Sequence, residues 1–332
     1  MSVPSGRARR DERGFALLAV ILVLALLSVV VTEFAFSVRL ETSMVRAYRD
    51  GILGRNLAEA GVQQAIREIL TDSNVQGLDD GGQVVFYTLP PGGTEAQRLP
   101  SLTREHVPLG AGEFSYRILD EESRLNINSG QTARTQRLLQ AMGIDKNERD
   151  TITDSIEDWR DANDTARPAG AESEDYLKLP VPYRARNANI QDIAELLQIK
   201  GITPEIYHGT AERPGLASIV TAWGPSTLNL NTASAPALAA MGFSDAEISA
   251  VMQSRKSAPY AAVPSQFGGR RMTTASTTFR IEADGLVAGE PRARIVAIVQ
   301  KSTSTGSGNT ATILSWRRDS PHPTPKEGSP KS

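Results

Sequence analysis

The feature that constrains this chain most is an apolar run near its start, from Phe15 to Val31, which contains no charged residue. Its only hydroxyl group belongs to Ser28, and a helix can satisfy that group by letting it donate to a carbonyl one turn earlier. Counted on to Val38, the mostly apolar stretch reaches the roughly 20 residues needed to cross a bilayer. Because a backbone in hydrocarbon must satisfy its own hydrogen bonds, the run is predicted to be a membrane-spanning helix.

The residues before this run predict its orientation and its processing. Four arginines and two acidic residues precede it, so the positive-inside tendency keeps the start of the chain in the cytoplasm and exports the rest. No small-residue cleavage site follows the run, as it would after a secretory signal. Instead, Gly14 stands between the basic leader and Phe15, and this arrangement resembles the type IV prepilin class. A plain signal anchor is the alternative interpretation.

Composition narrows the classes of function. The net charge is -2, and it falls to about -4 without the leader through Gly14, so no basic excess points to nucleic acid. The chain has no cysteine, which excludes disulfides and thiolate metal sites and leaves oxygen atoms as the natural metal ligands. Its three histidines are dispersed, and the sequence contains no Gly-x-Ser-x-Gly, His-Glu-x-x-His or phosphate-loop motif. We therefore predict a protein that is not an enzyme, and a membrane-anchored calcium-dependent hydrolase is the disfavoured alternative.

Apolar periodicity predicts one long helix, then strands, a helical block and strands again. The first helix is expected to run to about Leu70, and Gly51, Gly54 and Gly61, each costing it roughly 1 kcal/mol relative to alanine, mark bends or close packing. Strands are expected at 84–89, 112–120, 278–283, 293–301 and 311–317, and helices at 132–142, 148–159, 190–197, 203–207, 235–241 and 244–255.

These elements predict an α+β fold in which an N-terminal transmembrane and amphipathic helix precedes a pilin-like antiparallel sheet interrupted by a large inserted all-helical domain. The expected segments are a prepilin leader at 1–14, the helix at 15–70, the first part of the pilin-like domain at 71–120, the inserted domain at 121–276, the closing strands at 277–318 and a flexible tail at 319–332.

The helical block contains an internal repeat. The pattern Leu-Asn-Ile-Asn-Ser at 125–129 recurs as Leu-Asn-Leu-Asn-Thr at 228–232, and each copy leads to Ala-Met-Gly, at 141–143 and 240–242. The second copy resembles helix-hairpin-helix modules, which bind phosphate through a turn with two glycines. Because Gly242 is the only glycine in this turn, we expect the repeat to serve packing and not nucleic-acid binding.

An acidic cluster lies between Asp158 and Asp175, with seven carboxylate or amide side chains in eighteen residues. Crowded carboxylates repel one another unless a cation lies among them, and Ca²⁺ accepts six to eight oxygens from irregular loops more readily than Mg²⁺ does. The alternative interpretation is a solvated acidic loop that is stabilised by Arg160 and Arg167.

Several motifs, in this order along the chain, resemble the K-type minor pseudopilin of bacterial type II secretion systems, also named general secretion pathway protein K. Besides the leader, they lie at 120–128, at 158–161, from Gly170-Ala171-Glu172 to Tyr176, at 182–187, at 201–205 and at 223–233. The chain also has Ala19 at the fifth mature position, where most prepilins have glutamate, and this departure too resembles the K-type subunit.

The resemblance implies a function, partners and site residues. Prepilin peptidase would cut after Gly14 and methylate Phe15, leaving a single-pass protein of the bacterial inner membrane with most of its chain in the periplasm. The protein would initiate and cap the tip of the pseudopilus with I- and J-type minor pseudopilins on the assembly platform, supporting export of folded proteins across the outer membrane. A minor pilin of a type IV pilus, for adhesion or DNA uptake, is the alternative. Calcium would be bound by Asp161, Asp164, Glu172 and Asp175, with Asn163 as a further ligand.

The absence of a glutamate at Ala19 has a physical meaning under this interpretation. In a pilus, the buried glutamate of one subunit neutralises the N-terminal ammonium group of its neighbour, which otherwise has a large desolvation cost. A subunit with Ala19 offers no such partner to a subunit above it. The sequence therefore predicts a place at the tip, where no subunit lies above.

Overall fold

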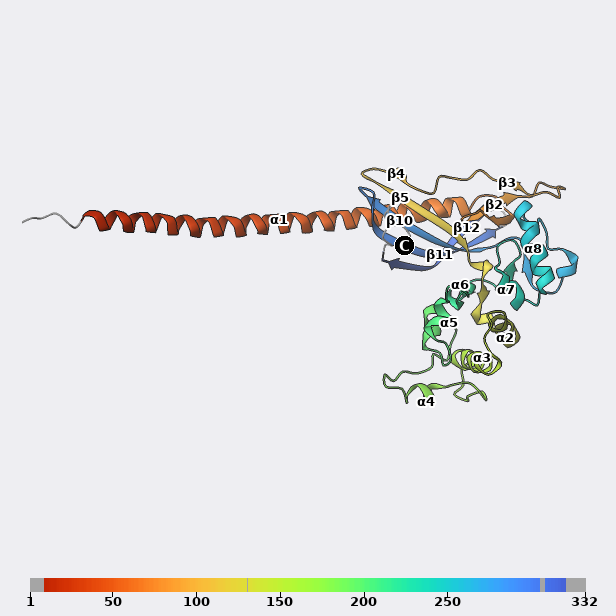
Figure 1. Ribbon diagram of the computed structural model, residues 1–332. Coiled ribbons are helices and arrows are strands. Elements are labelled where there is room, and N and C mark those ends of the chain that lie inside the picture. The colour runs from red at the N-terminus through yellow and green to blue at the C-terminus, as the bar shows by residue number, and fades with distance from the viewer. Residues whose placement is uncertain (1–8, 130, 305–307, 321–332) are drawn as a thin grey trace, which may run out of the picture.

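The structure is a computed structural model that describes residues 9–129, 131–304 and 308–320. A long helix, α1 (Arg9–Ile69), projects far beyond a body made of a sheet and a helical insertion (Figure 1). Residues 1–8 of the expected leader and residues 321–332 of the expected tail lie outside the described residues. The fold class predicted from the sequence is confirmed, because an antiparallel sheet follows the N-terminal apolar helix and is interrupted by a helical insertion.

Every residue of α1 from Phe15 to Arg49 is exposed, and Phe15 and Leu22 expose 76% and 58% of their surface. Ser28 Oγ donates to the carbonyl of Leu24 at 2.8 Å, which confirms the bond expected for this hydroxyl group. The helix ends one residue before the predicted Leu70, where Thr71 Oγ1 donates to the carbonyl of Glu68 at 2.7 Å and closes the last turn.

The main sheet has five antiparallel strands in the order β12-β11-β10-β5-β4. The second half of α1 packs against one face of this sheet (Figure 1). The two elements share a set of buried side chains that we call the sheet core, and each large side chain buried here contributes roughly 1.5 to 3 kcal/mol. The strands are β4 (Val107–Leu109), β5 (Gly112–Asp120), β10 (Thr278–Val287), β11 (Glu290–Ser304) and β12 (Gly308–Asp319), and the core includes Leu57, Val62, Tyr116, Ile281 and Ala297.

Glycines allow α1 to lie close to this sheet. A Cβ atom on Gly285 of β10 would collide with the backbone carbonyl of Gly54, and one on Gly54 would collide with the side chain of Arg292. A Cβ on Gly61 would press on Ala283 and Phe114, whereas one on Gly51 would meet open space. Two of the three helix glycines therefore mark close packing.

A second sheet of three short strands, in the order β1-β2-β3, covers the end of α1. Only β2 (Val84–Thr88) was expected from the sequence. Its neighbours β1 (Val75–Leu78) and β3 (Gln97–Arg98) are too short and too polar to produce an alternating pattern.

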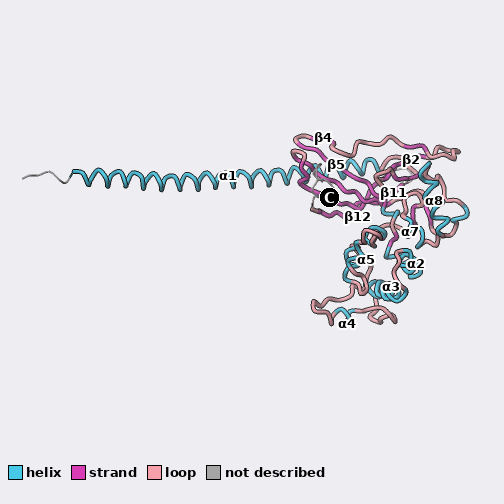
Figure 2. The backbone as a smooth tube through the Cα atoms, viewed as in Figure 1, coloured by secondary structure: helices cyan, strands magenta, loops and turns pink. Residues whose placement is uncertain are grey.

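The insertion leaves the sheet after β5 and returns to it at β10. These strands are adjacent, with Asp120 opposite Phe279, so the two ends of the insertion lie side by side. Short helices joined by long loops make up most of it (Figure 2). Its helices are η1 (Glu121–Ser123), η2 (Ile127–Ser129), α2 (Thr132–Ala141), α3 (Lys146–Arg160), α4 (Ser173–Tyr176), η3 (Ile193–Gln198), α5 (Pro204–His208), α6 (Leu216–Ile219), α7 (Ala235–Ala240), α8 (Asp245–Ser257) and η4 (Ser265–Phe267).

The insertion has its own hydrophobic core, separate from the sheet core. The N-terminus of α3 is capped by Asp145, which accepts from two backbone amides, and α8 begins with a capping box formed by Ser244 and Glu247. The helix expected at 190–197 is instead the 3₁₀ helix η3, because Asp192 caps a later start at Ile193. Buried residues of this insertion core include Leu138, Ile156, Leu196, Val220 and Leu238.

The repeat seen in the sequence has matching roles in the structure. Asn128 exchanges hydrogen bonds with the backbone of Ile190, and Asn231 does the same with the backbone of Tyr260. Each copy also forms a two-residue parallel bridge, β6 (Leu125–Asn126) with β7 (Val220–Thr221) and β8 (Leu228–Asn229) with β9 (Met272–Thr273). The helices that follow, α2 and α7, pack against each other, so both copies serve packing.

Three consecutive buried acids, Asp120, Glu121 and Glu122, join the insertion to the sheet. Asp120 Oδ2 accepts from Thr232 Oγ1 at 2.6 Å and from Ser276 Oγ at 2.7 Å. Glu121 pairs with Arg280 of β10. Glu122 Oε1 accepts from the backbone amide of Thr277 at 2.7 Å. We call these acids the junction triplet, because they bind the outgoing chain to the returning one.

Burial raises the pKa of Asp120 to about 7, and the neighbouring carboxylate of Glu122 adds to this effect. A carboxyl group whose pKa is raised by folding binds its proton more tightly in the folded state. Its contribution to stability is therefore present at low pH and is lost as pH rises toward 7.

We expect Asp120→Asn to reduce the fall in melting temperature between about pH 5 and pH 8, because the amide remains uncharged throughout this range. The measurement is thermal unfolding of the full chain in detergent across that range. Glu95→Gln, which removes an exposed carboxylate from the β2–β3 loop, is the control and should keep the wild-type pH dependence. Equal pH dependence of Asp120→Asn and wild type would contradict this assignment.

Candidate functional site

The acidic cluster forms the loop between α3 and α4, at the end of the insertion remote from the sheet (Figure 1). The aromatic rings of Trp159, Tyr176 and Tyr183 pack together beneath it, with centroids 5.3 Å apart for Trp159 and Tyr176. Lys200 Nζ donates to the carbonyl of Gly170 at 2.9 Å, and the backbone amide of Lys200 donates to the hydroxyl of Tyr176. The two halves of the loop are therefore held on a fixed apolar base.

Asp158, in the last turn of α3, is the most deeply buried acid of this loop, with a side chain 0% exposed. It belongs to the buried face of α3 together with Ile152, Ser155 and Ile156. A Cβ on Gly170 would collide with its Oδ2, so glycine lets the loop close over this carboxylate. Asp158 belongs to the predicted acidic cluster but is not one of the predicted ligands, and its position on the apolar face of α3 was the sequence signal of its burial.

Glu172 is the acid with unmet hydrogen-bonding capacity. Its residue is 3% exposed, and neither carboxylate oxygen has a hydrogen-bond partner. Burial, and after it the negative charges of Asp158, Asp161 and Asp164, raise its pKa to about 7. Buried carboxylates in folded proteins are normally paired, so the two oxygens of Glu172 depart from the usual pattern.

The other predicted ligands already form hydrogen bonds within the protein. Asp161 accepts from Arg167, and Asn163 donates to Asp161 at 2.7 Å. Asp164 Oδ1 accepts from Asn187 Nδ2 at 2.9 Å. Asp175 has a different role. Its Oδ2 accepts from the backbone amide of Glu172 at 3.2 Å, at the start of α4.

Within residues 9–129, 131–304 and 308–320, no three Asp, Glu or His side chains are close enough to hold a metal ion as they stand. The oxygen atoms of these residues are nevertheless of the kind that binds a hard cation. The buried carboxylate of Glu172 lacks hydrogen-bond partners, and the negative charges of Asp158, Asp161 and Asp164 act on it. A cation there would require the surrounding carboxylates to close around it.

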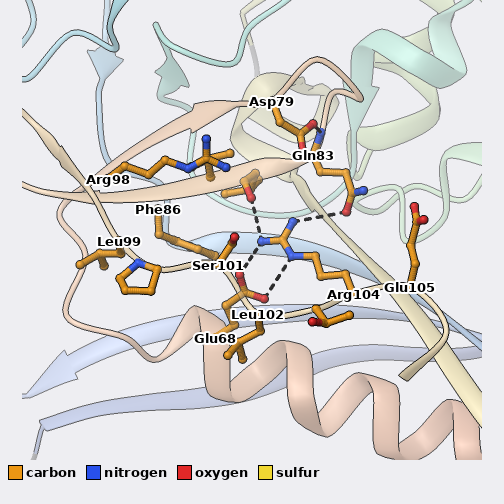
Figure 3. Close-up of a pocket in the computed structure, with 14 residues that line it drawn as sticks. Glu68, Asp79, Gln83, Phe86, Arg98, Leu99, Ser101, Leu102, Arg104 and Glu105 are labelled. Carbon is orange, nitrogen blue, oxygen red and sulfur yellow. Dashed lines mark hydrogen bonds and ion pairs between the residues drawn. The ribbon is translucent and has the colours of Figure 1, made fainter. Parts of the chain in front are cut away.

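A second feature is a surface cavity of about 310 Å³ beside the end of α1, lined by residues of β2 and of segment 98–105 (Figure 3). Glu68 of α1 pairs with Arg104 through two hydrogen bonds of 2.6 and 3.1 Å and accepts a third from the hydroxyl of Tyr116 at 3.0 Å. Arg104 also donates to the carbonyl of Val84 at 2.9 Å. These groups satisfy one another, so the arrangement fastens an exposed segment to α1.

In the part of the chain that the structure describes, α1 alone is long and apolar enough to span a membrane, and its most apolar window is not buried against the body. Gly14 and Phe15 both lie within this continuous helix. A helix of this length and composition is compatible with a single-pass anchor.

Comparisons with known proteins agree with this architecture. The family model described as type II secretion system (T2SS), protein K matches residues 116–212. The type II secretion system protein K of Pectobacterium carotovorum subsp. carotovorum is 28% identical over 222 residues, which cover 60% of this chain and 61% of that protein. The protein of the same name from Pseudomonas aeruginosa is 26% identical over 251 residues, covering 70% of this chain and 69% of the relative. The match thus spans about three fifths of the Pectobacterium relative.

Among solved structures, the crystal structure of the GspK-GspI-GspJ complex from the enterotoxigenic Escherichia coli type 2 secretion system contains a similar chain. The TM-score is 0.62 with 16% sequence identity, and the similarity covers 85% of this chain and all of that chain. At this identity the likeness establishes a shared fold. The family model, the two relatives and this shared fold point to the same similarity: the chain resembles type II secretion system protein K in sequence and in fold.

Proposed function

We propose that this protein is the minor pseudopilin that initiates and caps the tip of a type II secretion pseudopilus and so supports export of folded proteins across the outer membrane. The proposal rests on the position at which the insertion joins the sheet. Gly285 of β10 lies against Gly54 of α1, at the end of the sheet nearer the membrane-spanning half. The insertion leaves from Asp120 and returns at Thr278, at the opposite ends of the same two strands.

A bulky insertion at the end far from the membrane obstructs a subunit stacked on top but leaves the side of α1 free. Ala19 supports the same position, because it offers no carboxylate to the N-terminus of a subunit above. The proposed role is structural.

The partners proposed are I- and J-type minor pseudopilins, which the similar solved structure contains together with its K subunit. The surface of α1 supports this proposal. Leu40, Met44, Tyr48 and Ile52 form a stripe at four-residue steps that exposes 38% to 74% of each side chain beyond the apolar run. Such a stripe requires cover by another apolar surface, and the helices of partner subunits anchored in the same membrane would supply it.

Processing by prepilin peptidase in the inner membrane is part of the proposal, with the body of the protein in the periplasm. Gly14→Ala is expected to leave an uncleaved precursor that does not support secretion. The measurement is the mass of the N-terminus, together with the amount of secreted protein, in cells that contain the peptidase. Gly51→Ala is a matched control, because a Cβ at this helix glycine meets open space. Normal cleavage and secretion with Gly14→Ala would contradict the proposal.

Calcium is the proposed cofactor of the insertion. Glu172 is the central ligand because its buried oxygens lack partners, with Asp158, Asp161 and Asp164 beside it and Asn163 at the rim. Asp175, expected as a ligand, is proposed only as a supporting residue through its bond to the Glu172 amide. The bound ion would supply positive charge that offsets the repulsion among these carboxylates and so brace the loop.

The test is the melting temperature of the full chain in detergent, with calcium and with a chelator. Calcium at 100 times its Kd should stabilise the folded protein by about 2.7 kcal/mol, because it binds only the folded state. The double variant Asp161→Ala, Glu172→Ala should lose this increase.

Glu174→Ala is the matched control, because this neighbouring acid has a side chain 86% exposed and should keep the full calcium effect. An equal melting temperature of the wild type in calcium and in chelator would reject the metal. It would leave the pseudopilin assignment to be decided by the Gly14 experiment.

A further inference from the structure

The acidic loop already contains one cation of its own, the guanidinium group of Arg167. Its Nη1 donates to Asp158 Oδ1 at 2.8 Å and to Asp161 Oδ2 at 2.7 Å. The backbone amide of Arg167 donates to Asp158 as well, at 3.1 Å to Oδ2. A single side chain therefore bridges two of the acids that surround Glu172.

The two bridged acids differ in their freedom to move. Asp158 has a side chain 0% exposed and is enclosed by the chain at Gly170, so it keeps its position. Asp161 is 26% exposed, and the side chain of Arg167 is 38% exposed. The bond between Arg167 and Asp161 can therefore open toward solvent while the backbone bond to Asp158 stays closed.

Charge balance around Glu172 remains incomplete with this bridge in place. The negative charges of Asp158, Asp161 and Asp164 all act on Glu172, and Arg167 pairs only with the first two of them. Glu172 keeps two unpartnered oxygens. Asp161 accepts from Asn163 through Oδ1 and from Arg167 through Oδ2, so a divalent cation that uses Glu172 and Asp161 together must displace one of these donors. Repulsion between like charges favours displacement of the guanidinium group.

We propose that Arg167 is a built-in counter-ion that positions Asp158 and Asp161 in the metal-free protein and releases Asp161 when a divalent cation binds. This inference rests on the proposed calcium site. The guanidinium group stabilises the metal-free loop, because without it the carboxylates repel one another. It also weakens calcium binding, because its positive charge repels the ion and its hydrogen bond must first be broken.

These two effects predict opposite changes in one variant. Arg167→Gln should lower the melting temperature in chelator and at the same time tighten calcium binding on the order of tenfold, equal to about 1.4 kcal/mol of removed competition. If Arg167 had a purely structural role, the substitution would lower both the melting temperature and the affinity for calcium. Arg167→Lys keeps the charge and should bind calcium with a Kd nearer to that of the wild type.

The experiment is a calorimetric calcium titration of the full chain in detergent, with unfolding in chelator measured on the same samples. Arg186→Gln is the matched control, because Arg186 lies in the same insertion but pairs with Glu195 at 3.2 Å, outside the bridge. Its Kd for calcium should equal that of the wild type.

An unchanged or weaker calcium affinity of Arg167→Gln, with the wild type binding calcium, would overturn this inference and leave the metal site standing. No binding by the wild type would instead reject the metal site itself. If Arg167→Gln does not fold, the NMR signal of the Arg167 Nε–Hε group in the wild type provides the test instead. The signal should become more mobile on calcium addition, and unchanged mobility would overturn the inference.

Discussion

The architecture depends on a single constraint, the pairing of Asp120 with Phe279 on adjacent strands. Because the chain leaves and re-enters the sheet at neighbouring positions, an insertion of any size can fold on its own core without disturbing the sheet core. The junction triplet secures this connection, since Glu121 pairs with Arg280 and Glu122 accepts from the backbone amide of Thr277. The apolar half of α1 and the insertion thus lie at opposite ends of the same strands.

Two groups of buried carboxylates differ in their hydrogen bonding, and the contrast between them singles out Glu172. In the junction triplet, Asp120 accepts two hydroxyl hydrogen bonds, and Glu121 and Glu122 have partners on the returning chain. In the acidic loop, Glu172 is equally buried but neither of its oxygens has a partner. A folded chain rarely tolerates such a group without use, so the unsatisfied acid is where an external cation has the most to offer.

Much of the fold could be predicted from the sequence because its long elements carry strong periodic patterns. Strand β5 was predicted with both ends correct, and α1 to within one residue of its end. The short strands β1 and β3 and the four-residue helix α4 could not be predicted, since they are held by neighbours and not by a pattern of their own. For the site, the sequence located the acidic loop, but burial of Asp158 and Glu172 and the bridge from Arg167 are tertiary properties that composition does not encode.

The proposed cation braces an insertion whose core is separate from the sheet core, so its effect on the backbone should be local. Hydrogen exchange of the full chain in detergent, followed by mass spectrometry with calcium and with chelator, measures this effect. We expect slower exchange with calcium from about Asp158 to Tyr176 and unchanged exchange in β5, β10 and β11. Identical exchange in both conditions, or a change spread evenly through the sheet, would contradict it.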